Sequence, residues 1–198
     1  MRRVVHVGPT MAKGGMASVI HLLAANPPEG WRASSCNTFS RRGSIQKLRR
    51  WQIAKKEIKT GDFDLVHIHC AAGWSYKRKI SIAKVANAPV IFHIHSGKFD
   101  IDANVELKDY EVVCLSESWS EKLKPLIGDS ISVPNPVEPQ PKENVEREGF
   151  TLLMGRNDPV KGHSFAFSLG LDDLRVTGVE RAPAVSYTHL TLPTKRIV

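Results

Sequence analysis

The apolar positions of the chain change period repeatedly along the first 133 residues. Runs rich in β-branched residues, typical of buried strands, occupy six segments: residues 4–7, 35–39, 64–69, 88–93, 111–115 and 130–133. Apolar residues at helical spacing occupy four segments among them: residues 16–23, 45–60, 74–86 and 116–126. This alternation predicts an α/β fold, a Rossmann-like doubly wound parallel sheet with helices on both faces.

The ligand-binding edge of such a sheet is formed by the loops at the carboxyl ends of its strands. The loops after Val7, Ile68, Ile94 and Leu115 are therefore expected to share one cleft. Ser116 is a residue type typical of a helix N-cap, and we expect it to cap the helix that follows.

The composition changes after residue 133. Residues 134–148 are rich in proline and polar side chains, which is typical of a linker between domains, so we assign residues 1–133 to a first domain. Residues 149–182 begin a second domain with a buried-looking strand at 150–154, a helix at 164–169 and a strand at 174–177. A complete domain usually needs roughly 100 or more residues, so the second domain is predicted to be incomplete.

Residues 183–198 break the rhythm of the preceding chain. They resemble a translated sequencing adapter, a contaminant known from the ends of metagenomic reads, and we exclude them as an artefact. The alternative is a genuine edge strand with an irregular end.

The net charge of +8 indicates a polyanionic partner, such as a phosphorylated sugar, an anionic lipid or a nucleic acid. The basic residues are not interleaved with aromatic ones, and no helix-turn-helix or RNA-binding signature is present, so nucleic acid is not expected. The three cysteines, Cys36, Cys70 and Cys114, follow neither a disulfide nor a zinc-knuckle pattern, which favours a cytoplasmic protein. No apolar run reaches the ~18 residues of a membrane-spanning helix.

The predicted helix over residues 45–60 is amphipathic and strongly basic. Its apolar stripe comprises Ile45, Leu48, Trp51, Ala54 and Ile58, with Trp51 expected in the core. The basic segment between Arg41 and Lys59 has two interpretations. It docks peripherally on an anionic membrane at the inner face, or it is an ordinary solvated helix face.

Two glycine-bearing turns are candidates for phosphate binding. In the second domain, Gly155 and Arg156 are followed by Lys161 at the start of a helix, a pattern that predicts a grip on a diphosphate. In the first domain, Gly14 and Gly15 lead into a helix and offer backbone amides to a phosphate. In both cases the alternative is an ordinary turn.

Four histidines lie near the ends of two predicted strands. His67 and His69 alternate onto one face of their strand, and His93 and His95 do the same on the next. Neither a carboxylate nor a cysteine is placed to complete a zinc site, so no metal is expected. We interpret His93 as an interior residue and His95 as a functional one.

Together these features resemble family four of the retaining glycosyltransferases, over about residues 1–180. The resemblance is carried by six features in order: the loop over residues 8–15, the strand over 64–69, His93 and His95, the segment 114–118, the linker start at 133–136, and Gly155 and Arg156 with Lys161 and Gly162.

The resemblance implies a hexosyltransferase with two Rossmann-like domains (the GT-B architecture), acting in glycan biosynthesis. It would move a sugar, with retention, from a nucleoside diphosphate sugar to a carbohydrate or lipid-linked acceptor, without a metal or other cofactor. Arg156 and Lys161 would neutralise the departing diphosphate, which Gly14 and Gly15 would face. His95 would hydrogen-bond the donor sugar or the acceptor, as part of the catalytic set with both cations. His69 and Ser116 would line the cleft.

The sequence departs from the family pattern in two places. Pro136 stands where the family usually has glycine. The family's downstream pair of glutamates has no counterpart in these 198 residues, which indicates a truncated chain, inactive as it stands. The alternatives are a non-catalytic domain that binds a phosphosugar or nucleotide and, less favoured, a basic nucleic-acid-binding protein.

Overall fold

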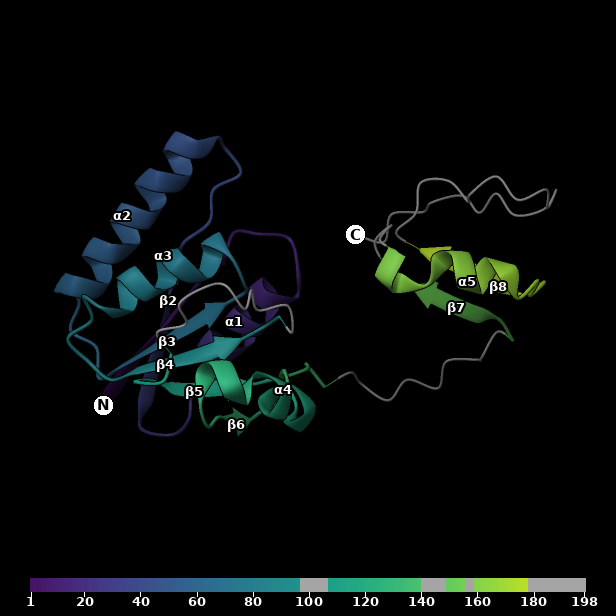
Figure 1. Ribbon diagram of the computed structural model, residues 1–198. Helices are drawn as coiled ribbons and strands as arrows, with labels where there is room; N and C mark the ends of the chain where they lie inside the picture. The colour runs from purple at the N-terminus through teal and green to yellow at the C-terminus, as the bar shows by residue number, and fades with distance from the viewer. Residues whose placement is uncertain (97–106, 140–148, 156–158, 178–198) are drawn as a thin grey trace. The chain divides into compact units, whose positions relative to one another are not determined.

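The computed structural model describes residues 1–96, 107–139, 149–155 and 159–177 (Figure 1). The chain divides into two compact units, Met1–Gln140 and Pro141–Val198.

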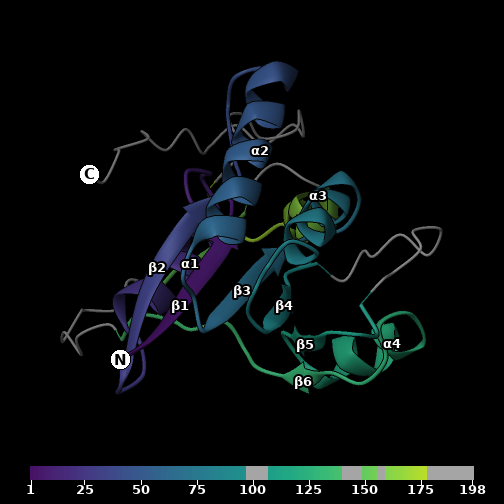
Figure 2. The same cartoon turned by 90° about the vertical axis from the view of Figure 1, so that its left-hand side faces the viewer.

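The first unit is built on a parallel sheet of six strands in the order β2-β1-β3-β4-β5-β6 (Figures 1 and 2). The strands are β1 (Arg2–Gly8), β2 (Trp31–Asn37), β3 (Leu65–Cys70), β4 (Val90–Ile94), β5 (Glu111–Cys114) and β6 (Ile131–Ser132). This arrangement confirms the predicted α/β fold with a doubly wound parallel sheet.

The described part of this unit contains four helices: α1 (Gly15–Ala25), α2 (Ser44–Thr60), α3 (Trp74–Ala83) and α4 (Glu117–Ile127). Ser116 caps α4 as predicted, because its side-chain oxygen accepts a hydrogen bond from the backbone N–H of Trp119 at 3.3 Å. Gly128 ends the helix with a φ of 78°, a conformation that favours glycine.

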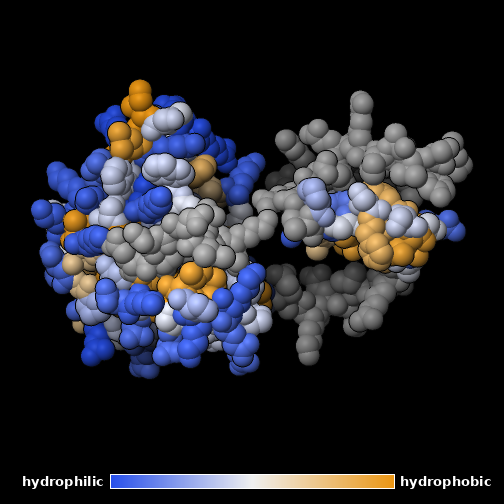
Figure 3. Space-filling model, in the orientation of Figure 1, coloured by the Kyte–Doolittle hydropathy of each residue, from blue (hydrophilic) through white to orange (hydrophobic). Residues whose placement is uncertain are grey.

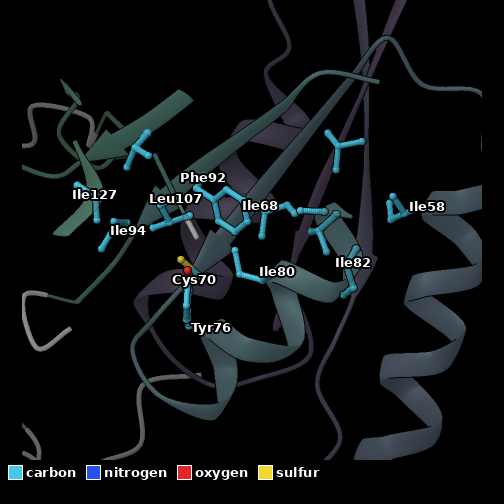
Figure 4. Close-up of a cluster of buried hydrophobic side chains, with 14 of the residues drawn as sticks. Ile58, Ile68, Cys70, Tyr76, Ile80, Ile82, Phe92, Ile94, Leu107 and Ile127 are labelled. Atoms are coloured by element: carbon cyan, nitrogen blue, oxygen red, sulfur yellow. The ribbon is translucent and has the colours of Figure 1, made fainter. Parts of the chain in front are cut away.

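One face of the sheet carries the apolar core. The paired strands place Val5 beside Val66, and Val7 beside Ile68, on this face. Helices α2 and α3 pack their buried residues against it, as the close-up in Figure 4 shows for Ile58, Ile80 and Ile82. The three cysteines are free and buried, and burial raises the pKa of the Cys70 thiol to about 12.

The opposite face of the sheet carries histidines and is packed by α1. A Cβ atom added at Gly8, the last residue of β1, would overlap the end of the Ile20 side chain of α1. It would also lie 3.3 Å from the Cβ of His69 on β3. Gly8 therefore lets α1 approach the histidine-bearing face closely.

Two predicted boundaries were wrong by three or four residues, and others differ by one or two. The second strand begins at Trp31, four residues earlier than predicted, since it is an edge strand whose polar side chains hide its period. Helix α3 ends at Ala83, three residues early, and the fourth strand begins at Val90, after Pro89. Pro89 lacks an N–H donor, although its carbonyl accepts from Val66 at 2.9 Å.

The predicted apolar stripe of α2 is buried along only part of its length. Ala54 and Ile58 are buried, but Ile45 is 82% exposed and Leu48 is 54% exposed. Trp51, predicted in the core, is half-buried, and its indole N–H donates to the Ser81 hydroxyl at 2.8 Å. The stripe is exposed toward the N-terminus of α2 because α3 packs only against the later turns.

Within residues 149–155 and 159–177, the second unit contains a two-stranded parallel sheet, a short 3₁₀ helix and one α-helix. Its elements are β7 (Thr151–Met154), η1 (Pro159–Lys161), α5 (His163–Ser168) and β8 (Leu174–Thr177). The prediction that the first strand is buried was wrong, since Leu152 is 46% and Met154 is 70% exposed. Strand β7 pairs with β8 alone among the described strands, and its residues Thr151, Leu152 and Met154 are exposed.

Most of the predicted linker (residues 140–148) and the whole tail over residues 183–198 lie outside the described residues. Among the helices that the structure describes, none combines the length and apolar character needed to cross a bilayer.

Candidate functional site

The carboxyl edge of the six-stranded sheet brings together the residues that follow β1, β3, β4 and β5. Strands β1 and β3 are neighbours, but the chain leaves β1 toward β2 and leaves β3 toward β4. This reversal makes the space outside β1 and β3 the switch point of the sheet, where parallel α/β sheets bind their ligands.

A glycine loop leads from β1 to α1 at this switch point. Gly14 has a φ of 150°, and a Cβ added at Gly14 or Gly15 would meet nothing within 4 Å. No side chain of the described residues caps α1. The backbone N–H groups of Ala17 and Ser18 donate to the carbonyl of Gly14, so Gly15 and Met16 are the amide donors that the start of the helix offers. Lys13, an exposed cation beside the glycines, was missed by the sequence analysis. The loop is open, rich in N–H donors and positively charged.

His69 and His95 form a hydrogen-bonded pair behind this edge. The Nδ1 atom of His69 lies 2.9 Å from the Nε2 atom of His95. The backbone N–H of His95 donates to the carbonyl of Cys70 at 2.8 Å, which holds His95 beside the end of β3. His69 is fully buried, whereas His95 is half-buried, so His95 is the member of the pair that reaches the edge.

Five histidines from three neighbouring strands gather on the same face of the sheet. We call them the histidine cluster: His6, His67, His69, His93 and His95. The sequence analysis missed His6. Its position two residues before Gly8 places it on the face of Gly8, which is the signal that could have identified it.

Several ring nitrogens of the cluster lack partners. The Nε2 atom of His67 and both ring nitrogens of His93 are buried without a hydrogen-bond partner among the described residues. The Nδ1 atom of His6 lies 3.4 Å from the Nε2 atom of His69. Buried polar atoms without hydrogen-bond partners are uncommon in proteins. These ring nitrogens therefore point to a ligand site or to another functional role.

Burial keeps the cluster uncharged at neutral pH. It lowers the pKa of His6 to about 4, and that of His93 to about 4 with a smaller contribution from His6. Burial, His93 and Lys79 together lower the pKa of His95 to about 3. The pKa values of His67 and His69 are lowered well below their usual range for the same main reason, burial. All five rings are therefore neutral at pH 7, and each has one unprotonated nitrogen.

Ser116 lies at the same edge, after β5. Its hydroxyl lies 3.0 Å from the Ser118 hydroxyl in addition to capping α4. Both partners of the Ser116 hydroxyl therefore lie within three residues of it in the chain.

Lys161 and Gly155 contact each other in the second unit. A Cβ added at Gly155 would lie 3.1 Å from the Cγ atom of Lys161, so the lysine stem packs directly over the glycine. Gly162, with a φ of 70°, adopts the left-handed conformation and starts α5. Arg156, the second predicted cation, lies outside the described residues.

A buried lysine near the carboxyl edge was also missed by the sequence analysis. Lys79 on α3 is 3% exposed, and its Nζ atom donates to the Ser75 hydroxyl at 3.3 Å. Burial lowers the pKa of Lys79 to about 8. It lines a small pocket with five other residues: Thr38, Trp51, Ser75, Arg78 and Ile82.

No family model matches the chain, and no curated protein matches it. Among solved structures, one similar chain is a lipopolysaccharide outer core galactosyltransferase, WaaB, in its apo form. The two share 14% identity with a TM-score of 0.49, over 88% of this chain and 59% of that chain. The chain thus spans less than two thirds of that protein. At this identity and TM-score the likeness says nothing of activity or substrate.

Proposed function

We propose that the chain is the acceptor-side domain and the start of the donor-side domain of a retaining glycosyltransferase with the GT-B architecture. It would take part in moving a sugar from a nucleoside diphosphate sugar to an acceptor hydroxyl. The observation that carries this proposal is the open glycine loop at the switch point between β1 and β3, on the same edge of the sheet as His95. The motifs that resemble family four supply the expected reaction.

The glycine loop is suited to one side of a diphosphate. Phosphate oxygens can approach Gly14 and Gly15 closely, because a Cβ built at either position meets nothing within 4 Å apart from its chain neighbours. The N-terminal amides of α1 would donate to these oxygens, and Lys13 would add countercharge. This arrangement binds an anion without a metal ion.

His95 is suited to hydrogen-bond the sugar or the acceptor. His69 engages its Nε2 atom, so Nδ1 is the ring nitrogen that faces a ligand. Because the lowered pKa keeps the ring neutral at pH 7, His95 would act through hydrogen bonding rather than through charge.

Lys161 and Arg156 in the second unit would neutralise the charge that develops on the departing diphosphate. The Lys161 stem packs over Gly155 and the residue is exposed, so its ammonium group is accessible to a phosphate. A cation placed beside the departing group stabilises the negative charge that develops there.

Nucleotide titration tests the proposal. Uridine diphosphate and guanosine diphosphate are titrated into the chain, and the affinity is compared with that of Arg156→Ala and Lys161→Ala. For the nucleotide that binds more tightly, each variant is expected to have an affinity about tenfold lower than the parent. The reason is that a charge-assisted hydrogen bond contributes about 1.5–3 kcal/mol. Lys122→Ala, at an exposed position of α4, is the matched control and should bind like the parent. Equal affinity in the parent and both cation variants contradicts the proposal.

We also propose that the N-terminal part of α2 contacts an anionic membrane surface, where a lipid-linked acceptor would reside. Ile45 and Leu48 are exposed there, next to the exposed cations Lys47, Arg49 and Arg50. Figure 3 shows apolar side chains at this end of α2 with hydrophilic ones around them. Apolar residues that enter the headgroup region beside cations are typical of helices that lie on membranes.

A further inference from the structure

The histidine cluster contains three rings that are placed like the protein ligands of a metal ion. His69 on β3 and His93 on β4 are direct neighbours in the register of the two strands. His95 follows His93 by two residues and lies on the same face. The centroids of the two rings are 4.3 Å apart. The parallel pairing therefore brings the three imidazoles together from two strands.

The candidate ligand atoms of His69, His93 and His95, one nitrogen from each ring, all lie within 4.8 Å of one another. Tetrahedral zinc with Zn–N bonds of about 2.0–2.1 Å holds its nitrogens about 3.4 Å apart. One pair in the triad, His69 Nδ1 and His95 Nε2, is 2.9 Å apart. This separation is within about 0.5 Å of the spacing that a bound zinc ion requires.

His93 provides a second and independent observation. Its side chain is 3% exposed, and neither ring nitrogen has a hydrogen-bond partner among the described residues. Leaving a buried polar atom unpaired costs about 1–3 kcal/mol. An ion bound between the three rings removes this cost at one nitrogen of His93.

His6 provides the outer support that metal-bound histidines usually have. The Nδ1 atom of His6 lies 3.4 Å from the Nε2 atom of His69. When His69 binds an ion through Nδ1, its Nε2–H faces His6 and can donate to it. Such outer hydrogen bonds orient a ligand ring and fix its tautomer.

We propose that His69, His93 and His95 bind one transition-metal ion of the zinc type, with His6 as the outer partner of His69. Three neutral imidazoles without a carboxylate favour zinc, nickel or copper over magnesium and calcium. Three protein ligands also leave a fourth position open, on the side of the half-buried His95. The site shares His95 with the proposed sugar transfer, which itself requires no metal ion.

A second triad, His6, His67 and His69, shares one ring with the proposed site. Its His6 and His67 come from β1 and β3, so substitutions separate the two triads cleanly. If substitution of His93 or His95 lowers the affinity for Zn²⁺, the ion binds at the proposed site. If substitution of His67 lowers it, the ion binds at the other triad.

Metal titration of the full chain, produced without an affinity histidine tag and stripped with a chelator, tests this proposal. Zn²⁺ is titrated against a chromophoric competitor at pH 7.5, and Co²⁺ is used to record the visible bands of a tetrahedral site. One ion per chain is expected. His93→Asn and His95→Asn should each lose at least about 100-fold in affinity, and His6→Asn about tenfold, as for an outer partner.

Two control variants are expected to bind Zn²⁺ like the parent: His67→Asn inside the cluster, and His21→Asn at an exposed position of α1. Circular dichroism checks that each variant is folded. Because the His95 ring is only half-buried, His95→Asn should disturb the packing of the protein less than His93→Asn. The proposal is overturned if the parent binds Zn²⁺ no tighter than His93→Asn, or if His67→Asn loses as much as His93→Asn. Parallel nucleotide titration separates failure of this site from failure of the proposed transferase function.

Discussion

His69 and His95 share a single short contact, 2.9 Å between Nδ1 of the first ring and Nε2 of the second. Burial lowers the pKa of both residues, so at pH 7 both rings are neutral and one proton lies between them. Either His69 Nδ1–H donates to His95, or His95 Nε2–H donates to His69. The choice also decides whether His69 Nε2 accepts from His6 or donates to it.

Zinc is expected to select one tautomer of His69. Coordination through Nδ1 removes the proton from the shared contact and leaves His69 as the Nε2–H form, which donates to His6. Long-range ¹H–¹⁵N correlation spectra of protein labelled in its histidines, recorded before and after Zn²⁺, check the tautomer. Addition of Zn²⁺ to the His67→Asn variant should change the His69 signals in the same way as in the parent. A His69 ring that stays in the Nδ1–H form at saturating Zn²⁺ contradicts coordination through Nδ1.

The sheet was predictable because its inner strands are short, apolar and rich in β-branched residues. Strands β1, β3 and β4 lie between two others, and their apolar composition reflects burial on both faces. Among the strands that the structure describes, β2 pairs with β1 alone, and its sequence of tryptophan, arginine, alanine and serines shows no clear period. The prediction of β2 therefore placed its start four residues late.

The candidate site was predictable only in part. Gly14, Gly15 and His95 were identified because they follow strands, and the order of elements alone places such residues at the carboxyl edge. Lys79 was not identified from the sequence, because a lysine in a helix is usually exposed. Its burial depends on how α3 packs. The mutual distances of the histidines depend on strand register, which the sequence does not provide.

Gly8→Ala is expected to destabilise the first unit by about 1–3 kcal/mol, because the added methyl group overlaps Ile20 and crowds His69. Urea unfolding followed by circular dichroism measures the change in the free energy of unfolding. Gly15→Ala is the matched control: a Cβ there meets nothing within 4 Å, and alanine suits the first turn of α1 better than glycine. Equal stability of Gly8→Ala and the parent would show that α1 does not pack closely on β1.

Lys79→Met is expected to stabilise the protein at pH 7 by about 1–3 kcal/mol, because it removes a buried charge that lacks a carboxylate partner in the described part of the chain. The pKa of Lys79 is lowered by burial from 10.5 in the unfolded chain to about 8 in the folded one. The unfolded chain therefore binds more protons between these values, and stability rises as the pH increases from about 8 to about 10.5.

The difference in unfolding free energy between Lys79→Met and the parent should thus shrink across this pH range. Thermal and urea unfolding at several pH values measure it, and taking the difference cancels the titration of other groups. Lys77→Met, at an exposed position of the same helix, should leave the profile of the parent unchanged. A constant difference between Lys79→Met and the parent from pH 7 to pH 10.5 would contradict a lowered pKa.

The exposed end of α2 predicts binding to anionic vesicles. Fully burying an apolar side chain of this size contributes about 1.5–3 kcal/mol, so the double variant Ile45→Ser with Leu48→Ser should bind at least about tenfold more weakly than the parent. Cosedimentation with phosphatidylglycerol vesicles measures the affinity, and added salt should weaken it because the contact includes Lys47 and Arg49. Ile131→Ser removes an equally apolar side chain, 59% exposed on β6, and should bind like the parent. If the double variant and Ile131→Ser bind alike, or if neutral phosphatidylcholine vesicles bind as well as anionic ones, α2 is an ordinary solvated helix and the membrane surface must be sought elsewhere.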